Sequence, residues 1–375
     1  MNILIITGSL SGGGTERVSV ILANYLCDEG YNVNIAAFYS NESHYTVSDN
    51  ITIYKLPDLR TKSTGFINRY INSIKDYRSL KKIIKDNNIK TVISFCSTLP
   101  VILFLLATEK INMISTKRNY PPASSRLRTC IEIFIFNRSK NIVFQTLEQM
   151  NFYNKKIREK GIIIPNPIHE NLPAQYIGQR RKEIVTFCRI ARQKNLIMLI
   201  NGFTKFNSNF KDYKLTIYGN CSSKDIPYKN QLINLIAERK MNHIIKIEEF
   251  NLNIHNLVFD SACFVLTSNF EGLSNSMLEA MAMGLPVICT DCYGGGAKTF
   301  IKNYENGILI PVNDEEALCN ALVYIASNPE KAQEMGNKAT KIKETLSQRN
   351  ICKQWKNILD EQIYYPTQST LQECR

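Results

Sequence analysis

The feature that most constrains the fold lies at residues 262–290, where two apolar runs flank a polar segment. Ala262–Ser268 is apolar with β-branched residues, which is typical of a buried strand. Gly284–Thr290 opens with a helix-stopping glycine and continues as a second apolar run. Between the two runs, Glu271 and Glu279 lie on either side of a Gly-Leu-Ser-Asn turn that can open a helix. The segment therefore predicts a strand, a loop, a helix and a strand, with one carboxylate in the loop and one on the helix.

Such a loop is a candidate ligand site, because ligands of an open parallel sheet bind at the carboxyl ends of its strands. Amide N–H groups of residues 273–276, at the start of the predicted helix, suit a phosphate. Carboxylates on either side accept hydrogen bonds from sugar hydroxyls. The segment therefore favours a nucleotide-sugar site. We expect the donor to lie against four consecutive residues, Gly272, Leu273, Ser274 and Asn275.

The rest of the chain alternates short apolar runs with amphipathic segments, which predicts βαβ crossovers and parallel sheets. Asn2–Thr7 is the first predicted strand, and residues 16–28 form the first predicted helix. A polar, proline-bearing stretch from Pro165 to Arg181 is a plausible linker, and the alternation restarts at Ile184. Residues 350–363 are amphipathic and predict a C-terminal helix.

Several motifs, in this order and spacing, resemble those of the retaining glycosyltransferases of family 4, which have the GT-B architecture. Glu271 and Glu279, followed by Ala-Met-Ala-Met-Gly-Leu-Pro-Val-Ile, resemble the E-x7-E signature of that family. The other matching segments are Gly12–Arg17, Val143–Gln149, Ile164–Ile168, Arg189–Asn195, Leu215–Gly219 and Glu305–Val312. The resemblance covers most of the chain.

The resemblance implies an α/β fold of the GT-B type, with two Rossmann-like, doubly wound parallel-sheet domains facing a crevice. We expect an acceptor-side domain over residues 1–168 and a nucleotide-sugar donor domain over residues 169–349. The C-terminal helix, at about residues 350–375, should cross back onto the first domain.

The resemblance also implies roles for single residues. Arg189 and Lys194 match the pair that meets the donor diphosphate, where Arg supplies a planar fork and Lys a point charge. Taken alone, the two would be a solvated surface pair. Glu271 would contact donor-sugar hydroxyls near the anomeric carbon, and Glu279 would accept from both ribose hydroxyls. Further donor-side candidates are Gly13, Gly14, Gly219 and Asn166.

The chain departs from the family in two places. Many relatives carry a histidine after the fourth N-terminal strand that meets the sugar C6 hydroxyl, but residues 45–168 contain none. The local sequence resembles a subfamily with Ser-x-Arg-Asn, so Arg118 and Asn119 would take that place, with Glu16 as a further acceptor-side candidate. The usual Gly-Pro-x-Glu is here Gly296–Thr299. Both departures leave the donor hexose open.

Charge is unevenly distributed along the chain. Residues 1–180 hold 23 of the 46 Lys and Arg but only 13 of the 33 Asp and Glu, so most of the net charge of +13 lies there. Basic segments at 60–90 and 126–138 favour peripheral contact with an anionic membrane, or are solvated helix faces. No apolar run approaches the ~20 residues that span a bilayer, and no signal peptide is evident. We expect the protein to be cytoplasmic, either free or at the inner face of the membrane. We expect no nucleic-acid partner.

The sequence does not favour metal or redox chemistry. It has no Asp-x-Asp, the ligand motif of metal-clamped GT-A enzymes, and its four histidines are isolated. The eleven cysteines form no framework and fit reduced, buried side chains. Cys289 and Cys292 spell C-x-x-C without further ligands nearby. The glycines after the first strand do not spell G-x-G-x-x-G, so an NAD site is not expected. We therefore expect no metal and no cofactor.

The sequence thus predicts a retaining, metal-independent glycosyltransferase. It would move a hexose or N-acetylhexosamine from a nucleotide sugar, with a UDP-sugar favoured over a GDP-sugar. The acceptor would be a glycan or lipid-linked glycan in the synthesis of a surface polysaccharide, such as capsule or lipopolysaccharide. The alternative is a GT-B-fold sugar-nucleotide epimerase or hydrolase, which should need a histidine at the sugar. A non-catalytic scaffold is disfavoured because both cations and both glutamates are present.

Overall fold

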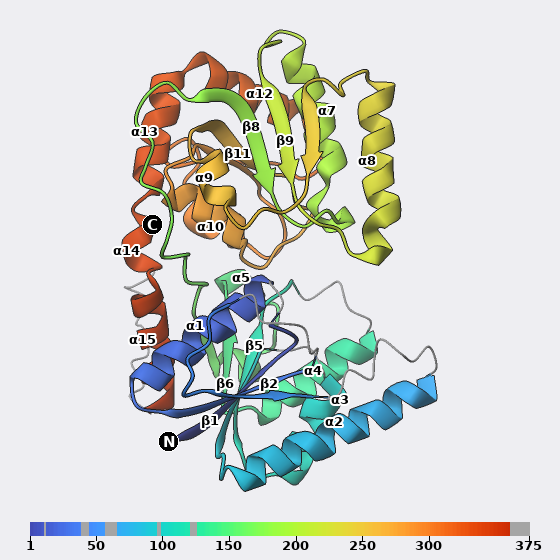
Figure 1. The fold of residues 1–375 in the computed structure, drawn as a ribbon, viewed down its shortest axis with the longest axis vertical. Coiled ribbons are helices and arrows are strands. Elements are labelled where there is room, and N and C mark those ends of the chain that lie inside the picture. Colours follow the sequence, from blue (N-terminus) through green and yellow to red (C-terminus); the bar gives the residue numbers. More distant parts are fainter. Residues whose placement is uncertain (11–12, 39–44, 57–65, 96–98, 121–125, 361–375) are drawn as a thin grey trace. The chain divides into compact units, whose positions relative to one another are not determined.

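The structure, a computed structural model, describes the chain except for residues 11–12, 39–44, 57–65, 96–98, 121–125 and 361–375. The chain divides into two compact units, each built on one parallel sheet (Figure 1). The first unit comprises Met1–Pro167 together with helix α15 (Gln348–Leu359). The second unit comprises Ile168–Ser347.

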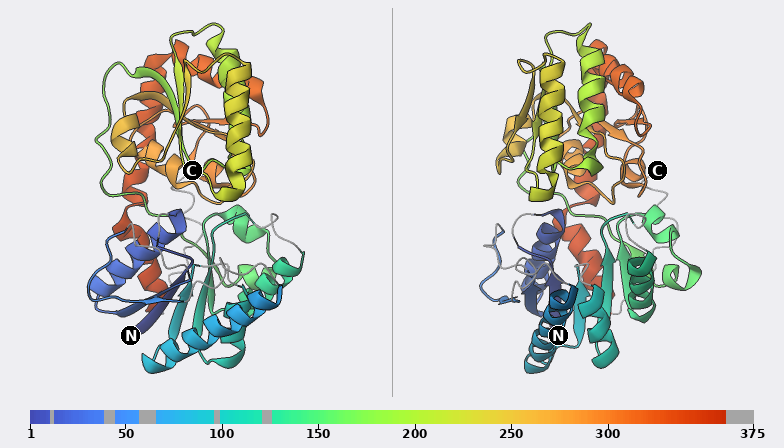
Figure 2. Two further views of the ribbon diagram at one scale, coloured as in Figure 1. Left: turned by 45° about the vertical axis from the view of Figure 1, so that its right-hand side comes forward. Right: turned by 90° about the vertical axis from the view of Figure 1, so that its right-hand side faces the viewer.

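The first unit holds a seven-stranded sheet of order β3-β2-β1-β4-β5-β6-β7, with helices on both faces (Figure 2). Its strands are β1 (Asn2–Thr7), β2 (Asn32–Ala37), β3 (Thr52–Lys55), β4 (Thr91–Ser94), β5 (Asn112–Lys117), β6 (Asn141–Phe144) and β7 (Gly161–Ile163). Its other helices are α1 (Gly14–Asp28), α2 (Phe66–Asp86), α3 (Leu99–Thr108), α4 (Arg126–Arg138), α5 (Leu147–Asn151) and α6 (Lys155–Arg158). The strand order reverses at β1, so the carboxyl ends of β1 and β4 flank a topological switch point.

Continuous burial explains the apolar strands of the first unit. Residues 3–7 of β1 are all buried, as expected for a strand covered on both faces. Helix α1 buries Val18, Leu22 and Leu26 at helical spacing. Helix α15 packs against α1, and its Trp355 is 1% exposed.

The second unit holds a six-stranded parallel sheet of order β10-β9-β8-β11-β12-β13. Its strands are β8 (Arg181–Phe187), β9 (Lys214–Tyr218), β10 (Ile245–Glu248), β11 (Ser261–Leu266), β12 (Val287–Thr290) and β13 (Ile308–Ile310). Its helices are η2 (Arg192–Lys194), α7 (Leu196–Asn207), η3 (Ser223–Asp225), α8 (Ile226–Glu238), α9 (Ile254–Val258), α10 (Asn275–Ala282), α11 (Gly296–Phe300), α12 (Glu315–Ser327), α13 (Pro329–Ala339) and α14 (Ile342–Thr345). Helices α7 and α12 pack on each other, and a Cβ on Gly202 would lie 2.6 Å from Leu318 Cδ2.

The two sheets confirm the predicted pair of doubly wound, parallel-sheet units. Strand β8 begins at Arg181, three residues before the predicted Ile184, because Arg181 pairs with Ser261 of β11. Strands β3, β7 and β13 and helices α12–α14 were not predicted from the sequence. The described part of the C-terminal helix ends at Leu359, and the remainder of the predicted range from 361 lies outside the described residues. Within the described ranges, no helix has the length and apolar character that a membrane span requires.

Candidate functional site

Three of the predicted donor-side residues follow strands at one edge of the second sheet. Arg189 follows β8, Gly219 follows β9 and Glu271 follows β11. These strands are parallel neighbours, so their carboxyl ends meet at the same edge. The backbones after β8 and β9 approach so closely that a Cβ on Gly219 would lie 1.9 Å from Cys188 O. Only glycine fits this position without movement of the backbone.

Lys194 and Glu271 form an ion pair at this edge. Lys194 Nζ contacts Glu271 Oε1, and the two side chains are only 9% and 14% exposed. Ser268 Oγ donates to the same carboxylate oxygen at 3.1 Å. Burial lowers the pKa of Lys194, but its neighbours, the carboxylate of Glu271 first among them, together raise that pKa above its ordinary value. The ammonium therefore remains charged although it is buried.

Hydrogen bonds hold the loops that carry this pair together. Asn195 has a φ of 46° and its Nδ2 donates to Asn269 Oδ1 at 3.1 Å. Asn269 N donates to Gln193 O at 2.9 Å, and Gln193 Nε2 donates to Phe270 O at 2.8 Å. The loop after β8 and the loop after β11 thus hold each other. Arg189 is exposed on the first of these loops, and its charge opposes the rise in the pKa of Lys194.

The predicted Gly-Leu-Ser-Asn turn opens α10 as expected. Gly272, Leu273 and Ser274 are buried, and Asn275 is the first residue of the helix. Ser274 Oγ accepts from Met277 N at 3.4 Å, so the protein itself satisfies one amide of the first turn. A phosphate contact through the amides of residues 273–276 stays a prediction.

Glu279 lies on α10 and contacts a histidine that the sequence did not single out. His255 Nε2 lies 3.0 Å from Glu279 Oε2. The expectation that the four histidines are isolated is wrong for His169 and His255, whose ring centroids lie 5.5 Å apart. Nothing in the spacing reveals the contact, since 24 positions separate His255 from Glu279. Across the described ranges, no three His, Cys, Asp or Glu side chains form a group that could hold a metal.

The glycine loop of the first unit encloses a carboxylate. Gly13 is the N-cap of α1, Gly14 is its exposed first residue, and Gly12 lies outside the described residues. A Cβ on Gly13 would lie 2.0 Å from Glu16 Oε2, so the carboxylate folds back over the glycine backbone. Ser9 Oγ donates to Glu16 Oε1 at 3.5 Å. The structure thus brings Gly13 and Glu16 together at the carboxyl end of β1.

A partly buried cation, Arg118, lies at the carboxyl end of β5. Arg118 Nη1 donates to Asn166 Oδ1 at 2.7 Å, and the guanidinium carbon lies 4.7 Å from the ring centre of Phe95 and 5.8 Å from that of Trp355. Its Nε and Nη2 atoms are buried and have no hydrogen-bond partner among the described residues. Burial lowers the pKa of this guanidinium. Asn119 is exposed beside it. Arg118 and Asn166 therefore lie together, in the first unit.

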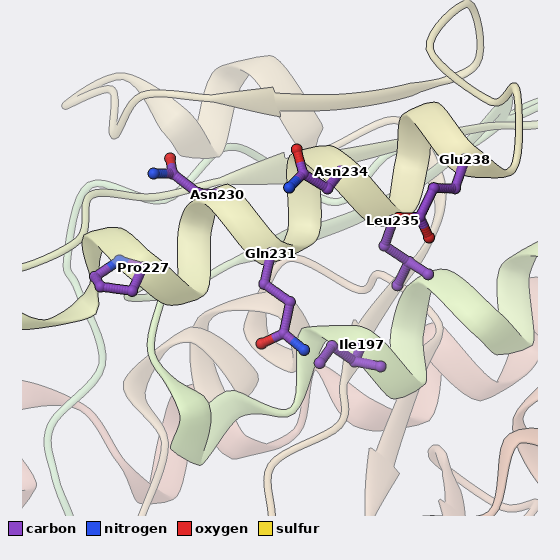
Figure 3. A pocket seen from close by; sticks show the side chains of 7 residues that line it. All are labelled: Ile197, Pro227, Asn230, Gln231, Asn234, Leu235 and Glu238. Atoms are coloured by element: carbon purple, nitrogen blue, oxygen red, sulfur yellow. The ribbon is translucent and has the colours of Figure 1, made fainter.

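A separate hollow of about 420 Å³ lies between α7 and α8 (Figure 3). It is lined by Ile197, Pro227, Asn230, Gln231, Asn234, Leu235 and Glu238. None of the predicted site residues belongs to this lining. The hollow therefore plays no part in the site described above.

Known proteins resemble this chain in sequence. Residues 169–342 match the family model described as Glycosyl transferases group 1. An uncharacterized glycosyltransferase of Haemophilus influenzae is 26% identical over 93% of this chain and 97% of its own. The GalNAc-α-(1→4)-GalNAc-α-(1→3)-diNAcBac-PP-undecaprenol α-1,4-N-acetyl-D-galactosaminyltransferase of Campylobacter jejuni is 23% identical over 96% of this chain and 99% of its own.

Solved structures extend the comparison to the whole fold. Anabaena HepE in complex with UDP-glucose superposes with a TM-score of 0.81 at 15% identity, over 96% of this chain and 100% of its own. Sucrose-phosphate synthase from Thermosynechococcus elongatus superposes with a TM-score of 0.82 at 16% identity, over 96% of this chain and 98% of its own. The fold is therefore GT-B, and the family match and the relatives support glycosyltransferase activity. The family match falls on the second unit, which carries Lys194, Glu271 and Glu279.

Proposed function

We propose that this glycosyltransferase is retaining and metal-independent, and that it moves a hexose or N-acetylhexosamine from a nucleotide sugar, with a UDP-sugar favoured. The acceptor is a glycan or lipid-linked glycan in the synthesis of a surface polysaccharide, capsule or lipopolysaccharide. The observation that carries the proposal is the buried Lys194–Glu271 pair at the carboxyl edge of the second sheet. The UDP-glucose in HepE and the undecaprenol-linked glycan in the name of the C. jejuni relative support it.

In the proposed mechanism, protein cations neutralise the leaving diphosphate. Lys194 stays charged because Glu271 raises its pKa, and the exposed Arg189 adds a planar fork of donors. The donor diphosphate competes with Glu271 for the ammonium, which releases the carboxylate toward the sugar hydroxyls. Fixed charges at the leaving group stabilise the transition state without reorganisation. The leaving phosphate oxygen takes the acceptor proton on the same face, so no separate base is required.

The first unit supports an anionic or lipid-linked acceptor. Helix α2 exposes Lys75, Arg78 and Lys82, and α4 exposes Leu127, which is 72% accessible. On α4 the Arg138 guanidinium carbon lies 3.5 Å from the ring centre of an exposed phenylalanine. Cations mixed with exposed apolar side chains suit the surface of an anionic membrane. The proposed place of action is the inner face of the membrane.

The test is a transfer assay of the full chain with a panel of UDP- and GDP-sugars and lipid-linked glycan acceptors, in the presence of a chelator. We expect product only when acceptor is added. NMR should show that the new glycosidic bond has the same anomeric configuration as the donor. Glu271→Gln should abolish transfer, and circular dichroism should show that the variant still folds although Lys194 has lost its counterion. Sugar release or epimerisation without acceptor would identify a hydrolase or epimerase instead. An inverted product, or a strict need for divalent metal, would overturn the proposed mechanism.

A further inference from the structure

We propose that His255 is a positioning residue for Glu279, and that it holds the carboxylate in the orientation that accepts the ribose hydroxyls of the donor nucleotide. This inference rests on the proposed function, in which Glu279 is the ribose ligand. It adds a residue from α9, an element outside the family motifs of the sequence.

The contact between the two side chains is direct and shielded from water. His255 Nε2 lies 3.0 Å from Glu279 Oε2, and the side chains are 12% and 7% exposed. A carboxylate only accepts hydrogen bonds, so the histidine presents an N–H at Nε2. A buried carboxylate is costly without such a donor. The bond therefore both stabilises Glu279 and selects one of its orientations.

The imidazole is itself held by rings from two other segments. Its centroid lies 6.0 Å from that of Phe187, with the planes at 89°, and 5.5 Å from that of His169. Phe187 ends β8 and is 6% exposed. His169 Nδ1 accepts from Asn171 N at 3.1 Å, which orients the second imidazole. The rings restrict the rotation of His255, so the position of its Nε2 is determined by the fold.

This arrangement lowers the cost of organising the ribose site. Two vicinal hydroxyls need a carboxylate in a defined plane, and a carboxylate free to rotate would lose entropy on binding. His255 restricts that rotation in advance, since it bonds Oε2 from α9 while Glu279 extends from α10. Preorganisation of this kind raises affinity for the ribose hydroxyls and leaves the rest of the nucleotide unaffected.

The experiment compares two nucleotides on the full-length wild type and four variants. UDP and 2′,3′-dideoxy-UDP are titrated by calorimetry into the wild type, His255→Gln, His255→Phe and Glu279→Gln, and the corresponding GDP pair is used if UDP does not bind. His243→Gln is the matched control, because His243 is exposed and precedes β10 at the opposite, amino-terminal edge of the sheet. Melting temperatures show that each variant is folded.

We expect H255F to weaken UDP binding about tenfold, as for loss of one hydrogen bond to a charged group, and to raise the donor KM more than it lowers kcat. H255Q should retain most of the affinity, since its amide supplies an N–H. All variants should bind dideoxy-UDP equally, a result that a merely structural role would not give.

Three outcomes would overturn the inference, and they differ in whether the proposed function fails with it. If H255F binds UDP like the wild type while E279Q does not, His255 has no positioning role and the proposed function stands. If H255F loses equal affinity for UDP and dideoxy-UDP, the role of His255 is structural. If E279Q leaves UDP affinity unchanged, or no nucleotide binds at all, the ribose role in the proposed function fails together with the inference.

Discussion

The two signature glutamates differ in the partner that holds each of them. Glu271 is held by a buried ammonium, whose positive charge a diphosphate can attract away. Glu279 is held by an imidazole, a weaker electrostatic partner that leaves the carboxylate available as an acceptor. The Lys194–Glu271 contact can therefore give way to a Lys194–diphosphate contact when the donor binds. The His255–Glu279 contact can remain in place. Residues in one motif thus have different local chemistry.

Removal of one partner from the Lys194–Glu271 pair should cost stability, and removal of both should restore it. We expect Lys194→Met to lower the free energy of unfolding by about 3 kcal/mol, because it leaves a carboxylate buried without its counterion. The double variant K194M/E271Q should recover most of that loss, since no lone charge remains. Both variants should be inactive in transfer. Chemical denaturation and the transfer assay measure the two effects separately. A double variant as unstable as K194M would show that the pair is not coupled.

Loss of charge at Arg118 and at its neighbour Lys117 should have different effects on the stability of the protein. Lys117 Nζ contacts both oxygens of Glu132 at 2.8 Å, whereas two donors of Arg118 are buried without a partner among the described residues. We expect Lys117→Met to cost about 3 kcal/mol of unfolding free energy, since the Glu132 carboxylate loses its counterion and keeps only the hydrogen bond from Tyr153. Arg118→Met should leave stability unchanged or raise it, because the desolvated charge is removed, while transfer activity falls.

The same denaturation and transfer assays measure the stability and the activity of R118M, with K117M as the matched control. A loss of stability in R118M as large as that in K117M would show that Arg118 serves the fold rather than the acceptor.

The sequence predicts part of the site and not the rest. Lys194 and Glu271 could be named because a motif carries each of them, but their mutual contact depends on two loops that only the sheet brings together. His255 could not be named, since a lone histidine on a five-residue helix has no recognisable spacing. Contacts between elements depend on strand order, which a periodic pattern does not encode.

At the scale of elements, burial decides which strands the sequence reveals. Strand β11 is buried at all six positions and reads as an apolar run. Strand β3 lies at the sheet edge with no buried position, and β7 has only three residues, all partly buried. Neither therefore shows an apolar run or an alternation. The interior strands of each sheet and the edge strand β10 were predictable, whereas the edge strands β3, β7 and β13 were not.

Helix α15 should contribute strongly to the stability of the first unit. Trp355 is 1% exposed and its ring centroid lies 5.5 Å from that of Phe95, which follows β4. We expect Trp355→Ala to cost about 3–5 kcal/mol of unfolding free energy through the cavity it leaves. Trp355→Phe should cost less, because it retains a ring against Phe95. Denaturation followed by circular dichroism measures both variants. Equal losses in the two would mean that the indole is not packed as described.

At the scale of the whole molecule, the proposed donor site and the sole tryptophan belong to different units. The chain has one tryptophan, Trp355, and it lies in the first unit. The four charged residues proposed to contact the donor nucleotide and sugar, namely Arg189, Lys194, Glu271 and Glu279, lie in the second unit. Tryptophan fluorescence therefore reports unfolding of one unit, whereas nucleotide binding should stabilise the other.

Calorimetry of the full chain should resolve this division. Units with separate cores unfold as separate transitions when their mutual contact is weak. UDP at about 100-fold its Kd should add about 2.7 kcal/mol to the unit that binds it, which shifts that transition by about 5–10 °C. We expect the shift in the transition that Trp355 fluorescence does not follow, and we expect Glu279→Gln to reduce it. If UDP shifted only the transition that the tryptophan reports, the nucleotide would be held by the first unit. The carboxyl edge of the second sheet would then not be the donor site.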